Sequence, residues 1–549
     1  MLKKLFIAFV FMVLAAAPAY GADPADDNGV FKIYYLGELV GAEKYTIRYT
    51  PGGGYTAEGN TSIKEDDTKI EMLNELVFGG EKVKLETYQA EIFINDLPKK
   101  LALKFDGAKA QVAIATGTRT IQKEIELLPT VMVVEPLSFH HLKIILDRYS
   151  IKVGGVQRFY VFKGTELKAV DVTVEDRGPD PAVLSYGAFR ARRLFVNLDD
   201  VGLSLWVDGK GRLLKVENRM QGYMAELEAY KGTAAKVPDS VNPHEDDPEL
   251  IYERVRFASG ELTLAGTLTR PRTASGKLPA VVFVSRDGPQ DRNGTVPYSG
   301  INIGTARMMN DLSRTGVVVL RYDDRGVGES GGSLATETFS ARVDDAAAAV
   351  DFLKSRPEVD PKRIGLVGHG EGGNAALVLA GKRKDLSAVA LLAASAIPLD
   401  ELALQQARKR LQQQGPAGED ELKQTPIYIA ISRARETDTK WTVIGRKNIN
   451  LDLFREWGAM TPKKDLVKVR AKVLIAQGGQ DQQVFPENGE ALHDAAQAAG
   501  MGNVTYEKFP KLDHFFVRSR GTIGEYSDPD RRPHPDFVRT LSEWLRENL

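Results

Sequence analysis

A glycine-rich turn and two later polar residues are the parts of this sequence best suited to chemistry. The turn is Gly368-His369-Gly370-Glu371-Gly372, between a strand-like apolar run and a helix-like run. Asp481 comes about 110 residues after Gly370, directly after a later apolar run, and His514 comes about 33 residues after Asp481, directly after the next such run. A carboxylate bonded to one imidazole nitrogen fixes the histidine tautomer, which allows the histidine to act as a general base. We therefore predict an Asp481–His514 pair near the turn; the alternative is a loop-capping aspartate and a surface histidine.

The elements that must position these residues alternate between strand and helix after residue 250. Nearly continuous apolar runs, typical of parallel strands covered on both faces, occur at 278–285, 316–323, 363–368, 388–394 and 471–478. Helical patterns lie between them, at 340–356 and 489–499. This alternation predicts an α/β fold with a doubly wound, mostly parallel sheet over 251–549. Residues 399–465 are rich in helix formers, and we expect a helical cap over the carboxyl edge of that sheet, where such sheets bind ligands.

The turn resembles the nucleophile elbow of α/β-hydrolases, in which Gly-x-Ser-x-Gly makes a strained turn that lifts serine to the start of a helix. Gly370 stands in the serine position. The order of Gly370, Asp481 and His514 matches the order of nucleophile, acid and histidine in that fold. The resemblance is to the bacterial esterase, thioesterase and serine-aminopeptidase branch, and it covers 251–549. It implies that Asp481 and His514 are the acid and the base of a triad.

Half of an oxyanion hole is expected in the segment 284–294, which follows a strand in the same resemblance. These enzymes use a backbone N–H there, and the second N–H belongs to the residue after the nucleophile, here Glu371. Relatives have Gly-Ser-Gly-Pro-Gln-Asp-Arg in this loop, so Arg286 and Asp287 depart from the pattern. The two residues either narrow the hole or form an ion pair on a solvated loop. We expect the Glu371 side chain to point away, into the first helical turn, where negative charge suits the dipole.

Gly370 has no hydroxyl, and the chain has no cysteine that could replace it. Ser285 and Ser395 lie near the expected sheet edge, but neither lies on an elbow, and we interpret both as ordinary strand-end serines. Asp324 and Arg325 belong to a turn that matches the family's Asp-x-Arg-Gly-x-Gly-x-Ser pattern, and we interpret them as structural. Covalent hydrolysis by the usual route is therefore closed in the sequence as written.

The first half of the chain has a different pattern. Residues 23–235 form short alternating segments with glycine and aspartate turns, which predicts an antiparallel β-rich domain. Hairpins are expected at 31–50 and 203–218 and a helix at 133–149. The stretch 205–217 is distantly similar to exported half-barrel domains related to lipoprotein carriers, a resemblance that names no activity.

Both ends of this β-rich region have distinctive compositions. Residues 1–22 contain Lys3 and Lys4, an apolar stretch and small residues, which predicts a secretory signal peptide and a periplasmic or secreted protein. Residues 236–250 are rich in proline, aspartate and glutamate, which predicts a linker. No later apolar run approaches the roughly 20 residues that cross a bilayer.

The composition excludes several classes of partner and cofactor. Lys plus Arg number 73 against 74 Asp plus Glu, a net charge of -1, so no nucleic-acid partner is expected. The absence of cysteine excludes disulfides, thiolate metal sites and an acylated N-terminal cysteine. His140 and His141 would diverge on a helix, while His244 and His534 sit among prolines, so we expect no metal or other cofactor.

Three functional hypotheses remain. The first is an exported hydrolase of esters, thioesters or peptides in which Gly370 is an engineered inactivation or is tolerated with weak activity. The second is a pseudo-hydrolase that binds a small acyl ester or peptide-like ligand without turning it over; retention of Asp481 and His514 argues against long inactivity. In the third, the β-rich domain binds lipid or an envelope partner and the hydrolase domain is mainly a scaffold.

Overall fold

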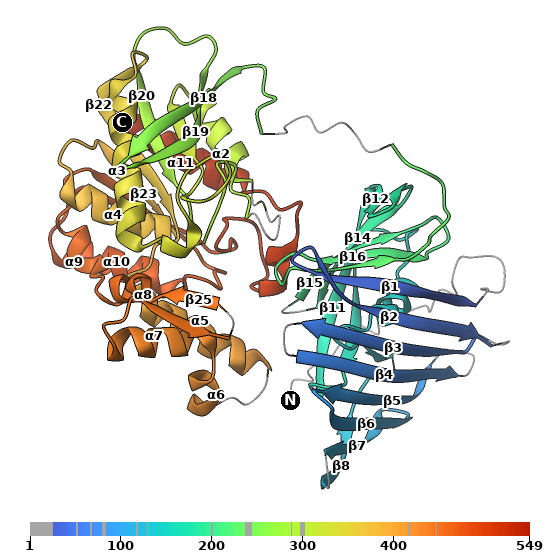
Figure 1. Cartoon of the computed structure of the whole chain (residues 1–549). Helices are drawn as coiled ribbons and strands as arrows, with labels where there is room; N and C mark the ends of the chain where they lie inside the picture. The colour runs from blue at the N-terminus through green and yellow to red at the C-terminus, as the bar shows by residue number, and fades with distance from the viewer. Residues whose placement is uncertain are drawn as a thin grey trace, which may run out of the picture. The chain divides into compact units, whose positions relative to one another are not determined.

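The fold is described from a computed structural model of the chain (Figure 1). It covers residues 26–50, 53–65, 68–79, 84–116, 119–128, 130–198, 201–236, 244–286, 288–296, 302, 304–414, 418–445 and 447–549. The predicted signal peptide, 1–22, lies outside the described residues. The chain divides into two units, Met1–Pro238 and Asp239–Leu549. Among the described residues, no helix combines the length and apolar character needed to cross a membrane.

An antiparallel sheet dominates the first unit, as its alternating pattern predicts. Its described residues place fifteen strands in the order β8-β7-β6-β5-β4-β3-β2-β1-β17-β16-β15-β14-β11-β10-β9, of which only the β9–β10 pair is parallel. The strands of this sheet are β1 (Asp27–Tyr35), β2 (Glu38–Tyr49), β3 (Tyr55–Glu65), β4 (Thr68–Gly79), β5 (Lys84–Ile94), β6 (Leu97–Asp106), β7 (Lys109–Thr116), β8 (Arg119–Glu126), β9 (Met132–Val133), β10 (Val156–Lys163), β11 (Lys168–Pro179), β14 (Arg192–Leu198), β15 (Val201–Val207), β16 (Leu213–Asn218) and β17 (Tyr223–Leu227). A separate hairpin joins β12 (Ala182–Leu184) and β13 (Gly187–Phe189).

In this unit, the two predicted hairpins are confirmed, whereas the predicted helix is longer than the observed one. β1 pairs with β2 and β15 pairs with β16, as expected for 31–50 and 203–218. The predicted helix over 133–149 is only α1 (His140–Leu146). Pro136 disfavours helical backbone in the residue before it, and Leu137 has a φ of 65° in the left-handed region, so the helix begins later.

The second unit contains the predicted mostly parallel sheet. Its described residues place eight strands in the order β18-β19-β21-β20-β22-β23-β26-β27, with β18, β19 and β21 antiparallel to one another in turn and the remaining neighbours parallel. These strands are β18 (Leu250–Ser259), β19 (Leu262–Pro271), β20 (Leu278–Val284), β21 (Val318–Tyr322), β22 (Val359–His369), β23 (Ala388–Leu392), β26 (Lys472–Gly478) and β27 (Val504–Phe509). Residues of the central strands are almost wholly buried, as their continuous apolar runs require.

Two layers of helices cover this sheet, and an apolar core lies on each face. On one face α2 (Thr305–Arg314) packs against α11 (Pro535–Asn548). On the other face lie α3 (Phe339–Ser355), α4 (Glu371–Lys382), α9 (Pro462–Leu466) and α10 (Glu487–Ala498). Short 3-10 turns occur at Leu334–Thr336 and Ile523–Ser527. The sheet is therefore covered on both sides, and side chains at its carboxyl edge remain available for a site.

The predicted cap is present but is not purely helical. It contains α5 (Leu399–Gln414), α6 (Glu419–Lys423), α7 (Pro426–Glu436) and α8 (Leu451–Gly458). The hairpin of β24 (Trp441–Ile444) and β25 (Lys447–Asn450) lies between α7 and α8 (Figure 1). Trp441, Thr442, Val443 and Ile444 all belong to residue types that favour strands, which explains why the helix-rich neighbours did not set this segment's conformation.

Part of the predicted linker, residues 236–250, belongs to the second unit. The boundary between the units falls within 236–250, but residues near its end pack on the second unit. Asp247 forms an ion pair with Arg314, and the His244 carbonyl accepts a hydrogen bond from Asn310 at 3.0 Å. Leu250 is already the first residue of β18.

Candidate active site

The glycine-rich turn adopts the sharp strand-to-helix geometry that its sequence predicts. Gly370 follows β22 and precedes α4, with φ 56° and ψ -123°. A positive φ is strained for a residue with a side chain. The Gly370 N–H donates to the Leu392 carbonyl at 2.8 Å, and the Gly370 carbonyl accepts from the Gly373 N–H at 2.9 Å. Hydrogen bonds on both sides therefore fix position 370.

The glycines around position 370 are required by close backbone contacts. A Cβ atom on Gly368 would lie 2.3 Å from the Gly372 carbonyl oxygen, and one on Gly372 would lie 2.1 Å from the Ser285 carbonyl oxygen. Neither carbonyl is the end of a flexible side chain that could move aside. The turn therefore excludes side chains at both flanking positions, as expected for an elbow.

Asp481 and His514 lie together although 33 residues separate them in the chain. His514 Nδ1 is 3.0 Å from Asp481 Oδ2, and both side chains are fully buried. The other carboxylate oxygen of Asp481 accepts from the N–H groups of Gln483 and Val484 at 2.8 and 2.9 Å. Because β26 and β27 are parallel neighbours, the loops after them meet at the carboxyl edge of the sheet. His514 is therefore not a surface residue, whereas Asp481 both contacts His514 and caps its own loop.

His369 joins the elbow to the His514 loop, a connection that the sequence analysis missed. Its Nε2–H donates to the His514 carbonyl at 2.8 Å. The two imidazole rings stack with centroids 4.7 Å apart. The end of the elbow strand and the histidine loop are thus in direct contact through His369, the residue before position 370.

The three residues expected at the oxyanion hole differ in what the structure describes. Asp287 lies outside the described residues. Arg286 is buried, with its guanidinium carbon 5.1 Å from the Phe515 ring centroid, so Arg286 does not lie on a solvated loop. Glu371 lies in the first turn of α4, and Glu371 Oε1 accepts from the Trp457 indole N–H at 2.9 Å, a contact that the sequence analysis did not predict. Trp457 belongs to the cap helix α8, and this cap contact decides the orientation of Glu371.

The loop after β20 is held by a buried polar cluster. Ser285 Oγ donates to Asp324 Oδ1 at 2.6 Å and accepts from Arg342 Nη1 at 3.0 Å. The Gln290 N–H donates to the other Asp324 oxygen at 2.9 Å. Burial raises the pKa of Asp324 to about 7, although the positive charge of Arg342 acts in the opposite direction. Ser285 is thus engaged in positioning the loop, and Arg342, whose role the sequence analysis missed, anchors it.

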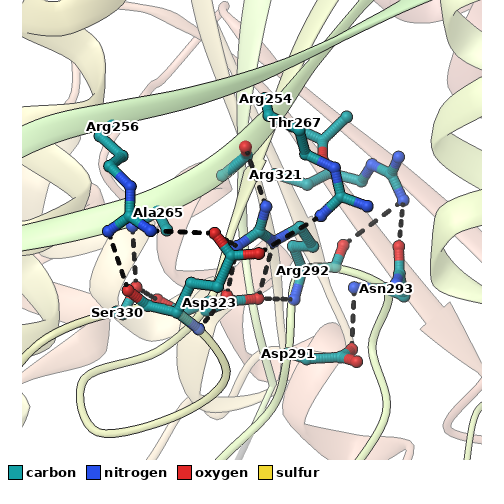
Figure 2. A network of polar contacts seen from close by, with 12 residues as sticks. Arg254, Arg256, Ala265, Thr267, Asp291, Arg292, Asn293, Arg321, Asp323 and Ser330 are labelled. Atoms are coloured by element: carbon teal, nitrogen blue, oxygen red, sulfur yellow. Dashed lines mark hydrogen bonds and ion pairs between the residues drawn. The ribbon is translucent and has the colours of Figure 1, made fainter.

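A second network ties the same loop to the turn after β21 (Figure 2). Arg292 Nε donates to Asp323 Oδ1 at 2.9 Å, and the Arg292 backbone N–H donates to the same oxygen at 2.7 Å. Asp323 Oδ2 also accepts from the Glu329 N–H at 2.9 Å. Arg325 forms a paired contact with Asp345 at 2.6 and 2.8 Å. These bonds support the structural interpretation of Asp324 and Arg325 and extend it to the neighbouring Asp323.

The other serine and histidine candidates make structural hydrogen bonds. Ser395 Oγ donates to the Ile397 carbonyl at 2.8 Å, as an ordinary strand-end serine does. His534 caps α11, where it accepts from the Asp536 N–H. Among the residues that the structure describes, no cluster of three or more His, Asp or Glu side chains could hold a metal ion.

Comparison with known proteins finds similarity mainly in the second half of the chain. Residues 304–516 match the family model described as serine aminopeptidase, S33. The chain is 28% identical over 330 residues to esterase EstD of Thermotoga maritima, an alignment that covers 57% of this chain and 71% of EstD. It is 36% identical over 167 residues to the thiohydrolase apmlB of Arthrinium phaeospermum, covering 29% of this chain and 49% of that relative.

Solved structures include Est1E from Butyrivibrio proteoclasticus with bound ferulic acid. That structure is 16% identical to this chain, with a TM-score of 0.36, and the match covers 53% of this chain and 96% of Est1E. The strand order, the elbow geometry, the Asp481–His514 pair and the family match agree with one another. The second unit therefore has the α/β-hydrolase fold, and residues 304–516 within it are similar to the serine aminopeptidase, S33 family.

Proposed function

We propose that the second unit is a hydrolase of carboxylic esters, thioesters or peptide bonds that has its acid and base in place but lacks the nucleophile. The observation that carries this proposal is the buried 3.0 Å contact between Asp481 and His514 in a loop that touches the elbow through His369. In this arrangement Asp481 orients His514, the Glu371 N–H is an oxyanion donor, and position 370 is where a serine hydroxyl would attack. As written, the chain is inactive or weakly active.

Weak activity has a defined route in this site. His514 would remove a proton from a water molecule while the water oxygen adds to the substrate carbonyl carbon. The proton then passes from the imidazolium to the departing alcohol, thiol or amine, and a carboxylic acid is released. Sites that have lost a triad member retain roughly 10³–10⁴-fold catalysis over water. This route forms no acyl-enzyme because Gly370 has no hydroxyl.

The test is hydrolysis of short-chain p-nitrophenyl esters by the chain as written and by Gly370→Ser. We expect turnover to rise by about 10³-fold or more in Gly370→Ser, since loss of a triad serine costs up to roughly 10⁶-fold. A fluorophosphonate probe should label Gly370→Ser and leave the parent chain unlabelled. Gly370→Ala is the matched control, because it adds a Cβ atom at the same strained position without a hydroxyl.

The outcomes distinguish a disabled hydrolase and slow water-dependent hydrolysis from ligand binding without turnover. Gain of turnover and labelling in Gly370→Ser supports a disabled hydrolase. If folded Gly370→Ser neither turns over nor reacts with the probe, the proposal fails, and binding of an acyl or peptide-like ligand without turnover becomes the better account. Any parent activity that survives His514→Ala unchanged contradicts the water route.

We also propose that the protein is exported, on the basis of the composition of residues 1–22. N-terminal sequencing of the protein from a periplasmic or culture fraction should begin near Asp23. Recovery of uncleaved protein only in the cytoplasm would contradict export.

A further inference from the structure

The cap touches both halves of the candidate active site. One contact reaches the loop that carries Asp481, and the other reaches the residue after position 370. The two contacts come from different cap helices, α5 and α8. The cap therefore makes hydrogen bonds to two separate parts of the candidate active site, the Asp481 loop and the first turn of α4.

The acid-loop contact runs through a single peptide group. Gln406 Nε2–H donates to the Gln483 carbonyl oxygen at 2.8 Å. The same peptide unit carries the Val484 N–H, which donates to Asp481 Oδ1 at 2.9 Å. A donor on the carbonyl side polarises the peptide and strengthens its N–H as a donor. Lys409 adds a cation–π contact with Phe485, 4.3 Å from the ring centroid, so α5 holds this loop from two positions.

Two consecutive residues at the end of α8 contact the hydrolase domain, and one of them, Trp457, contacts the residue after position 370. Trp457 donates its indole N–H to Glu371 Oε1 at 2.9 Å. Glu456 accepts from both the backbone N–H and the hydroxyl of Ser340, each at 2.7 Å. Ser340 lies on α3 and Glu371 lies on α4, so the end of α8 is bound to two helices of the hydrolase domain.

We propose that the cap positions the acid–base pair and the elbow through Gln406 and Trp457. Both are positioning residues: Gln406 acts through the Gln483–Val484 peptide on Asp481, and Trp457 acts through Glu371 on the first turn of α4. Displacement of the cap would release both contacts together. The catalytic consequence rests on the proposed function, whereas the structural coupling does not.

The structural coupling is tested on the full chain as written, by hydrogen–deuterium exchange with no catalysis required. Gln406→Leu removes the amide donor, and we expect exchange of the Val484 amide to accelerate by about tenfold, the effect of losing one hydrogen bond. Trp457→Phe retains the ring but removes the indole N–H, and exchange should accelerate at the Gly373 and Asn374 amides of α4.

Two control variants in the cap distinguish a specific positioning effect from general destabilisation of the cap. Gln405→Leu changes the neighbouring exposed residue of α5, and Trp441→Phe changes the other cap tryptophan; neither should alter exchange at the acid loop or the elbow. If Gln406→Leu unfolds α5, as protection of its own amides would reveal, Gln406→Asn keeps the polar group and withdraws it by one methylene. Unchanged exchange at Val484 and at Gly373 in folded variants overturns the proposal.

The catalytic arm uses the Gly370→Ser background. There, Gln406→Leu and Trp457→Phe should lower kcat by about tenfold while leaving KM for a short ester nearly unchanged, because the groups act on geometry rather than on the substrate. Glu371→Gln retains an oxygen acceptor for the indole and should keep part of the amide protection that is lost in Glu371→Ala. Failure of Gly370→Ser to turn over removes only the proposed function, since the exchange experiment reports on coupling in either case.

Discussion

Each unit of this protein contains a buried carboxylate–imidazole pair, and the two pairs differ in what surrounds them. In the first unit, His140 Nδ1 lies 2.7 Å from Glu43 Oε1; in the second, His514 Nδ1 lies 3.0 Å from Asp481 Oδ2. All four side chains are fully buried. By distance and burial alone the two pairs are equivalent.

Their surroundings give them different capacities. His140 begins α1, its backbone N–H donates to the second Glu43 oxygen at 3.1 Å, and its ring is seated against Gly59 of β3. The His141 ring lies 4.4 Å away, so the expected divergence of these histidines was wrong; both rings are enclosed by the sheet. The first pair therefore fastens a helix to a sheet, whereas the second adjoins a strained turn at a sheet edge. A carboxylate–histidine pair indicates catalysis only when a reacting group can be placed beside it.

The largest expected effect separates the two pairs by activity. In the Gly370→Ser background, Asp481→Asn should lower kcat by about 10⁴-fold, because the amide favours the wrong histidine tautomer. Glu43→Gln in the same background should leave kcat unchanged. Steady-state hydrolysis of a p-nitrophenyl ester measures both. Equal losses in the two variants would show that the first unit takes part in the chemistry.

The next effect concerns pH. Burial raises the pKa of Glu135, in the first unit, to about 7. Because the folded-state pKa lies above the ordinary 4.5, the folded protein binds more protons than the unfolded chain between pH 4.5 and about pH 7. The contribution of Glu135 to stability is therefore complete below about pH 4.5 and is lost as the pH rises through 7. We expect the free energy of unfolding of the first unit to fall by roughly 3 kcal/mol over that range, relative to Glu135→Gln. Denaturant titrations followed by exchange in peptides of this unit, at pH 5 and pH 8, provide the comparison. A parallel pH response in Glu135→Gln would exclude Glu135 as the source.

The smallest effect tests how tightly the first pair is enclosed. A Cβ atom on Gly59 would lie 2.3 Å from His140 Cε1. Gly59→Ala should therefore destabilise the first unit by about 1–3 kcal/mol, the usual cost of overpacking. Gly209→Ala is its control, because a Cβ atom there would meet no atom within 4 Å. Thermal unfolding of both variants is the measurement, and equal melting temperatures would mean that His140 can move aside freely.

The α/β-hydrolase fold and the Asp481–His514 contact were largely predictable from sequence. Continuous apolar runs locate β20, β21, β22, β23 and β26, and the glycines of the elbow indicate a turn too tight for side chains. Asp481 and His514 follow strands that parallel pairing brings to one edge, so their approach could be inferred from strand ends alone. Less was predictable in the cap, where a β-hairpin interrupts the helices, and at α1, which Leu137 shortens.

The contacts that sequence reasoning missed are those between segments without a shared motif. Trp457 and Glu371 are 86 residues apart, and Gln406 and Gln483 are 77 apart. Nothing in either local sequence indicates its partner. The buried pair of Glu43 and His140, 97 residues apart, is similarly absent from any pattern.

The sequence by itself determined the fold class of the second unit, the antiparallel nature of the first, the elbow and the absence of a hydroxyl at Gly370, because these follow from local periodicity and residue type. Tertiary structure alone decided which carboxylate lies beside which histidine outside the family pattern, how the Glu371 side chain is directed, and where the cap is fastened. Those features depend on side chains that packing brings together from distant parts of the chain, and the spacing of residues in the local sequence does not predict such contacts.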